Sequence, residues 1–168
     1  MLYGECRQYL AGRLKAAGIK SKVHTTMKSL EKSQESHLGA VLFESEDLNR
    51  NYSRTYYRDQ EGARKKRQKV FDRKLTFSVV IGGYTDDEVE TVFEKFLGSL
   101  DRGIWVDGNF VPLEAGEADW VDKDDSILKA QVAVQVRITF DGGLYQDTGS
   151  GRLSRIEVEV EDMNRGKE

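Results

Sequence analysis

Few side chains in this sequence have a type and spacing that could perform chemistry. The two histidines, His24 and His37, belong to no H-E-x-x-H or similar metal-ligand pattern. Cys6 is the single cysteine, which excludes a disulfide within the chain and a zinc site with several cysteine ligands. Because Cys6 lies on the apolar stripe of a predicted helix, we expect a buried thiol and not a nucleophile. The sequence therefore predicts no catalytic residue and no cofactor.

A cluster of aspartates late in the chain has the oxygen ligands that Ca²⁺ or Mg²⁺ binds. Its spacing matches no calcium-binding loop, and acidic residues in a predicted loop are most often hydrated side chains. We therefore expect no metal site, and a metal-dependent enzyme is the least favoured of the open functions. The cluster consists of Asp119, Asp122, Asp124 and Asp125.

Positive and negative charges are segregated along the chain. Residues 50–74 hold ten Lys or Arg against three acids, a net charge of +7, in a protein whose formal net charge is -3. Residues 101–125 hold eight acids against two bases, a net charge of -6. Opposite patches on one chain suit a head-to-tail contact between identical subunits, which closes into a ring when the rotation permits. The partner contacts predicted on this basis are Arg58, Arg64, Lys65, Lys66, Arg67 and Lys69, together with the four aspartates.

The centre of the basic segment, DQEGARKKRQK at residues 59–69, contains almost no apolar residue, so neither of its faces can belong to a core. Tyrosines precede it and Phe71 follows it, which indicates two strands joined by a charged tip, a projecting arm at about residues 50–74. Three functions remain open for the arm. It is a solvated loop, a nucleic-acid contact in which cations neutralise phosphates and tyrosines stack on bases, or a protein contact. We favour the protein contact.

The elements that must position these segments are two amphipathic helices and several strands. Apolar residues recur at helical spacing from Leu2 to Ala17, and Gly18 suits the end of that helix. A second helix begins after Thr85, which forms a capping box with Glu88. Strands are predicted at residues 38–46, 51–57, 74–83, 127–140 and 155–162, with a hairpin around 107–109, an irregular strand at 19–27, a turn at 29–36 and a flexible loop at 141–151.

This order of elements predicts an α+β fold. The sheet is largely antiparallel or mixed, with two main amphipathic helices on one face and a projecting basic β-hairpin arm. Residues 1–162 are expected to form one domain, and residues 163–168 a frayed tail. No apolar run approaches the ~20 residues that cross a bilayer, and the N-terminal segment has no pattern of a secretory signal, so we expect a cytoplasmic protein.

Four features of the layout carry a family resemblance. They are the opening helix ECRQYLAGRLKAAGI, the arm around EGARKKRQK, the helix TDDEVETVFEKFLGSL and the strand AQVAVQVRITFDGGLY, and together they span most of residues 1–145. In these features the chain resembles bacteriophage tail terminator or neck proteins, which cap a tail tube as a ring, and their relatives in prophages and tail-like particles.

The resemblance implies a structural protein without catalytic residues. Such a protein forms a ring, here expected to be a hexamer, that stops polymerisation of the tail tube and offers a surface to the head-side connector. The expected location is the cytoplasm of a bacterial host, followed by the virion tail or a tail-like particle. The ring would surround the path of DNA, so some arginines of the arm could face the lumen. A nucleic-acid-binding or general protein-interaction module remains the alternative.

Overall fold

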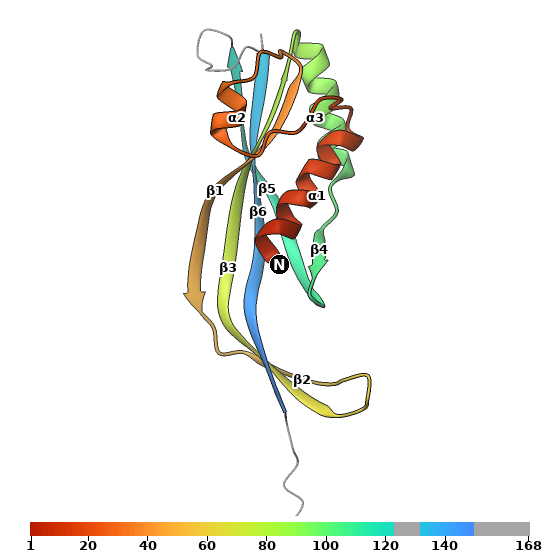
Figure 1. Cartoon of the computed structure of the whole chain (residues 1–168), viewed down its shortest axis with the longest axis vertical. Coiled ribbons are helices and arrows are strands. Elements are labelled where there is room, and N and C mark those ends of the chain that lie inside the picture. The colour runs from red at the N-terminus through yellow and green to blue at the C-terminus, as the bar shows by residue number, and fades with distance from the viewer. Residues whose placement is uncertain (123–131, 150–168) are drawn as a thin grey trace, which may run out of the picture.

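The computed structural model describes residues 1–122 and 132–149 and has an α+β architecture. Its strands are antiparallel and form a six-stranded sheet in the order β1-β3-β6-β5-β4, with β2 paired to β3 (Figure 1). The predicted fold class is therefore confirmed. The helices are α1 (Leu2–Ala16), α2 (Met27–Glu31) and α3 (Asp86–Ser99), and the strands are β1 (Leu38–Arg50), β2 (Arg54–Arg58), β3 (Arg64–Gly83), β4 (Gly103–Val106), β5 (Asn109–Asp122) and β6 (Val132–Gly149).

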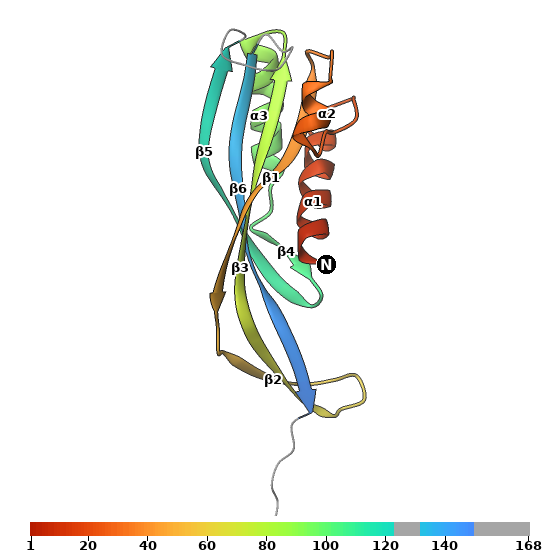
Figure 2. The same ribbon diagram turned by 60° about the vertical axis from the view of Figure 1, so that its left-hand side comes forward.

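The two longer helices, α1 and α3, cover one face of the sheet (Figure 2). The apolar stripe predicted for α1 is fully enclosed there, and Gly18, just after that helix, has a φ of 117°, as expected for a residue that ends a helix. Both helices pack against alternate residues of β3 and β6, whose side chains point to this face. The members of this core include Cys6, Leu10, Leu14, Phe77, Phe96, Val134, Ile138 and Phe140.

The short helix α2 covers part of the opposite face. Its Leu30 packs in a second, smaller buried cluster with Leu38, Ala40, Leu42, Val80 and Ala133. Segment 29–36, predicted as a turn, thus begins inside a helix. A five-residue helix with one apolar anchor has no periodicity to detect, although the Thr26 side chain caps it by accepting the Ser29 N–H at 3.1 Å.

Residues 19–27 do not form the predicted irregular strand. Their contact with the sheet is one parallel bridge between His24 and Ala40, at the edge of β1. The apolar residues that suggested a strand, Ile19 and Val23, are buried in the main core while the backbone crosses from one face to the other.

Helix α3 begins where its capping residues predict. The Thr85 hydroxyl accepts the Glu88 N–H at 3.2 Å. The Glu88 carboxylate accepts an N–H at 3.0 Å, but from Tyr84, one residue before the expected donor. Val89, Val92 and Phe96 are the buried residues of the helix.

β6 is longer than predicted, because residues 141–149 continue it as a strand where the sequence indicated a flexible loop. Two glycines caused the error. A Cβ atom on Gly142 would lie 2.6 Å from Leu2 Cδ2, and one on Gly143 would lie 2.4 Å from Lys69 Cε. These glycines therefore permit close packing within the strand and do not form a turn.

β3 and β6 continue beyond the part of the sheet that the helices cover, and with β2 they form the projecting arm at the lower end of the molecule in Figure 1. No residue of β3 from Arg64 to Lys74 is buried, whereas most residues from Leu75 to Gly83 are. We define the arm as β2, residues 64–70 of β3 and residues 144–149 of β6. β2 and β3 form the predicted hairpin, and β6 adds a third strand that the sequence did not indicate. The predicted strand at 155–162 and tail at 163–168 lie outside the described residues.

Candidate partner-binding surfaces

The basic residues of the arm are divided between its two faces. Residues directly opposite on paired strands share a face, and faces alternate along each strand. One face, which we call the paired face, contains the cross-strand neighbours Tyr57 and Lys65 and the cross-strand neighbours Arg67 and Asp147. Tyr56 with Lys66 and Arg58 with Arg64 lie on the other, which we call the basic face. The basic face consists of Arg54, Tyr56, Arg58, Arg64 and Lys66, and the paired face includes Tyr57, Lys65, Arg67, Lys69, Tyr145 and Asp147.

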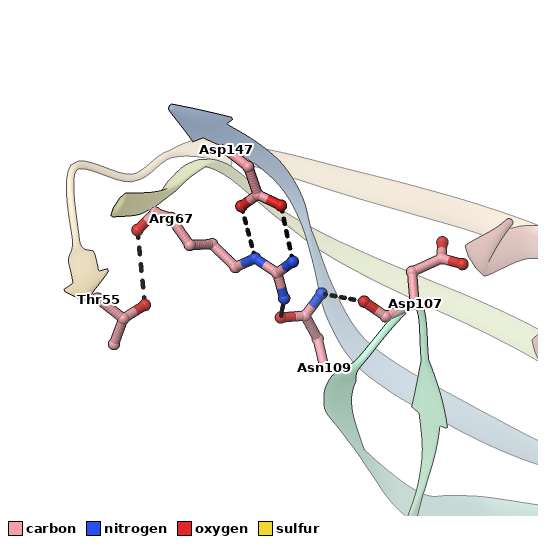
Figure 3. A network of polar contacts seen from close by, with 5 residues as sticks. All are labelled: Thr55, Arg67, Asp107, Asn109 and Asp147. Carbon is pink, nitrogen blue, oxygen red and sulfur yellow. Dashed lines mark hydrogen bonds and ion pairs between the residues drawn. The ribbon is translucent and has the colours of Figure 1, made fainter. Parts of the chain in front are cut away.

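Arg67 is the centre of the paired face. Its guanidinium donates two hydrogen bonds to Asp147, at 2.7 and 2.8 Å, and one to Asn109 Oδ1 at 3.1 Å (Figure 3). The group also lies 5.2 Å from the ring centre of Tyr57. Asn109 belongs to the β4–β5 hairpin, so this one side chain connects β3, β6 and the hairpin.

The other two lysines of the paired face also have acidic partners. Lys69 Nζ lies 2.6 Å from Asp72 Oδ1, and Lys65 Nζ lies 3.9 Å from Asp59 Oδ2. Each predicted contact residue on this face therefore has a carboxylate from its own chain.

These pairs shift the pKa values of their members in the expected directions. The hydrogen bonds from Arg67 lower the pKa of Asp147, and the same bonds raise the pKa of Arg67. Two hydrogen bonds lower the pKa of Asp72, and the bond from Lys69 has a larger effect than the bond from Asn51. All of these groups are thus charged at neutral pH.

The basic face has no such partners. Among the described residues, no carboxylate forms an ion pair with any of its four cations. Arg58 donates a hydrogen bond to the Gly62 carbonyl at 3.0 Å, and the Arg64 guanidinium lies 5.5 Å from the ring centre of Tyr56. The exposed fraction of Tyr56 is 57%. This face presents cations and an aromatic ring to the surroundings.

The acidic residues lie on β5, at the edge of the sheet. β4 pairs with β5 only up to Pro112, so β5 has an open edge beyond Leu113 among the described residues. Glu114, Glu117 and Asp119 are exposed there. Of the predicted acidic contacts, Asp122 ends β5, while Asp124 and Asp125 lie outside the described residues.

The acidic edge and the arm lie at opposite ends of β6. Asp119 is paired with Gln135, and Lys66 with Thr148. These two positions are 13 residues apart, which corresponds to about 40 Å at about 3.3 Å per residue, and Glu114, which pairs with Thr139, is about 30 Å from the same point of the arm. The basic face therefore cannot contact the acidic edge of its own subunit.

The β4–β5 hairpin follows the sequence prediction and adds an exposed aromatic pair. Its turn residues Asp107 and Gly108 have φ of 49° and 77°, which the type I′ turn requires. The cross-strand neighbours Trp105 and Phe110 have ring centres 5.4 Å apart and exposed fractions of 72% and 44%. The sequence indicated no role for these rings, for Arg54 or for Asp147. The alternation of side chains along residues 54–58 and 64–68 is the signal that could have separated the two faces.

Within residues 1–122 and 132–149 the structure has no group of three or more side chains arranged to hold a metal ion. No helix in this part of the chain has the length and apolar character needed to span a membrane. Cys6 is fully buried, and burial raises its pKa to about 12, so the thiol is protonated at neutral pH.

No protein-family model matches the chain, and no curated protein is significantly similar to it in sequence. The fold resembles the sheath/tube terminator, in its extended state, of an extracellular contractile injection system called PVC, with a TM-score of 0.47 and 12% sequence identity. The match covers 95% of this chain and 63% of that one, so the chain spans less than two thirds of that terminator.

Proposed function

We propose that this chain is a structural subunit of a phage tail or tail-like particle, a terminator that forms a ring, caps the tail tube and joins it to the head-side connector. One observation carries the proposal. In the described part of each subunit, a basic face without ion pairs and an acidic strand edge lie about 30–40 Å apart along β6. The two surfaces are complementary in charge but can meet only between subunits.

A contact between two different surfaces of identical subunits is heterologous. Such contacts repeat until the rotation closes a ring or continues an open filament. A terminator has to stop growth, which requires the closed form. The resemblance of the sequence layout to tail terminators gives the class of particle, and a hexamer is the proposed ring.

The chemistry of the chain agrees with a structural role. The Cys6 thiol is buried, His24 lies 2.7 Å from the Ser29 hydroxyl and His37 lies 3.2 Å from the Glu88 carboxylate. The proposed function needs neither a cofactor nor a metal. The proposed partners are identical subunits, the tail tube and the head-side connector. The proposed location is the cytoplasm of the bacterial host before assembly and the tail afterwards.

Binding of nucleic acid is the second candidate function, because the basic face combines cations with the exposed ring of Tyr56. In a ring this face could also approach DNA in the lumen. The two candidates differ in their dependence on other molecules, since ring formation requires only the protein.

Electron microscopy of the purified protein tests the proposal. Concentrated protein at low salt is expected to show closed rings with a uniform number of subunits. Filaments of indefinite length, or single particles at every concentration, would contradict a terminator ring. Addition of short random duplex DNA should leave the number of rings unchanged. Particles that form only with DNA would support the second candidate.

A further inference from the structure

The division of charge on the arm allows the docking site to be located. We infer that the basic face, and not the paired face, binds the acidic β5 edge of a second copy of this chain. This inference rests on the proposed function. The binding groups are Arg54, Arg58, Arg64 and Lys66 on one subunit and Glu114, Glu117 and Asp119 on the other.

The cations of the paired face already contact carboxylates of their own subunit. Lys65, Arg67 and Lys69 each face a carboxylate, and their side chains are 38%, 23% and 20% exposed. A second carboxylate could bind Arg67 or Lys69 only by breaking an existing close pair, whereas the contact of Lys65 at 3.9 Å is weaker. The paired face fixes the arm to the body and does not select a partner.

The basic face is organised to receive carboxylates. The Arg64 guanidinium lies over the Tyr56 ring, 5.5 Å from its centre. A guanidinium placed over a ring can still donate a bidentate hydrogen bond to a carboxylate. Arg64 and Lys66 occupy alternate positions of β3, about 6.5 Å apart. Arg54 and Arg58 are about 13 Å apart on β2 with Tyr56 between them, so the cations form two short rows.

The β5 edge matches these rows in charge and in form. Glu114 and Asp119 are cross-strand partners of Thr139 and Gln135, and Glu117 lies between them at a register shift. Of these three acids, Glu117 has a basic partner at 3.9 Å, Arg137, which is weak at that distance. Within residues 1–122 and 132–149 nothing pairs with this strand edge beyond Leu113, which leaves its backbone groups available beside the carboxylates.

A protein partner explains the arrangement better than DNA does. A DNA-binding arm gains affinity from every cation that reaches a phosphate. Here two of the seven cations of the arm, Arg67 and Lys69, form close ion pairs with acids of the same chain, and Lys65 lies 3.9 Å from a third acid. The remaining four occupy one narrow face, which fits a short row of carboxylates.

The test uses matched charge reversals in the full chain. The first variant, Arg64→Glu with Lys66→Glu, changes the basic face. The control, Lys28→Glu with Lys32→Glu, makes the same change of charge at exposed positions on and next to α2, far from the arm. The first variant should raise the concentration for half-maximal assembly by at least about tenfold, while the control should stay near the wild-type value.

A charge exchange identifies the partner surface. Glu114→Lys with Asp119→Lys should also prevent assembly, and mixing this variant with Arg64→Glu, Lys66→Glu should restore it, because every contact in the mixture can again join opposite charges. Circular dichroism melting checks that each variant is folded.

The outcomes separate the inference from the proposed function. If the wild type forms rings and the first variant assembles as well as the control, the docking site is wrong and the ring stands. If the mixture does not restore assembly, β5 is not the partner surface. If the first variant loses binding to fluorescent random duplex DNA while its mass equals that of the wild type, the basic face binds phosphate instead. A wild type that is monomeric under all conditions overturns both.

Discussion

Arg67 of β3 lies directly opposite Asp147 of β6, and two hydrogen bonds of 2.7 and 2.8 Å join their side chains. A third bond, to Asn109, joins Arg67 to the β4–β5 hairpin. The arm is thereby attached to the body at a defined orientation. A fixed orientation of the arm is what a closed ring requires, since the rotation between neighbouring subunits has to be the same at every contact.

Acid should release the arm before the body unfolds. Arg67 lowers the pKa of Asp147 in the folded protein, so this carboxylate stabilises the fold fully above its unfolded pKa of about 3.9. The contribution is lost as the pH falls through the lower folded pKa, and Asp72 behaves in the same sense. Hydrogen-exchange protection of β2 and residues 64–70 should therefore fall below about pH 4 while α1 and α3 remain protected.

The variant Asp147→Asn provides the control for this experiment. At neutral pH it should lower the protection of the arm, because the carboxylate is absent at any pH. Unchanged protection of the arm in this variant would mean that the pair with Arg67 does not hold the arm in place.

Two glycines should respond in opposite ways to substitution by alanine. A Cβ on Gly103 would lie 2.3 Å from the Val111 carbonyl oxygen, so Gly103→Ala should separate the hairpin strands and reduce the free energy of unfolding by about 1–3 kcal/mol. Gly12 is exposed within α1 with nothing within 4 Å of its Cβ position. Gly12→Ala should therefore stabilise the protein by about 0.5–1 kcal/mol. Urea unfolding measures both, and equal effects would refute the close approach at Gly103.

Cys6 should be unreactive in the folded protein. Burial raises its pKa to about 12, and nearby Glu5 acts in the same direction, so almost no thiolate exists at pH 8. Ellman's reagent should modify less than one tenth of the protein in the time that it modifies all of the protein in 6 M guanidinium. Rapid modification of native protein would show that α1 does not cover the thiol as described.

Arg137 should stabilise the contact between two irregular strands by a small amount that decreases with salt. Its guanidinium contacts Glu44 at 3.0 Å and Glu117 at 3.9 Å, and each glutamate lies at a register shift, in β1 and in β5. Because these groups are partly exposed, Arg137→Gln should cost less than about 1 kcal/mol of unfolding free energy at low salt, and less still in 0.5 M NaCl. Arg102 is also an exposed arginine, so Arg102→Gln is the control. An equal loss of unfolding free energy in the control would contradict a stabilising role of the Arg137 contacts.

The sequence predicts elements well where one local signal dominates. The apolar stripe of α1, the capping pair Thr85 and Glu88, and the alternation from Val132 to Phe140 each fix an element without knowledge of its neighbours. The turn at Asp107 and Gly108 belongs to the same group, because its backbone conformation is set by residue type.

The errors occur where a distant residue decides the structure. Gly142 and Gly143 indicated a loop, but Leu2 and Lys69 occupy the space that their side chains would need. The pairing of Arg67 with Asp147 joins positions 80 residues apart, and it depends on the register of β3 against β6. The sequence therefore located the basic residues of the arm but could not tell which of them are already neutralised.

The central claim, that complementary surfaces on identical subunits assemble a ring, is tested most directly by the solution mass of the wild type. Size exclusion with light scattering should be run across concentration in low and in high salt. The proposal predicts a single species of about six subunits at low salt and high concentration, which dissociates as salt screens the charges. A mass of about 19 kDa at every concentration and salt would contradict the claim.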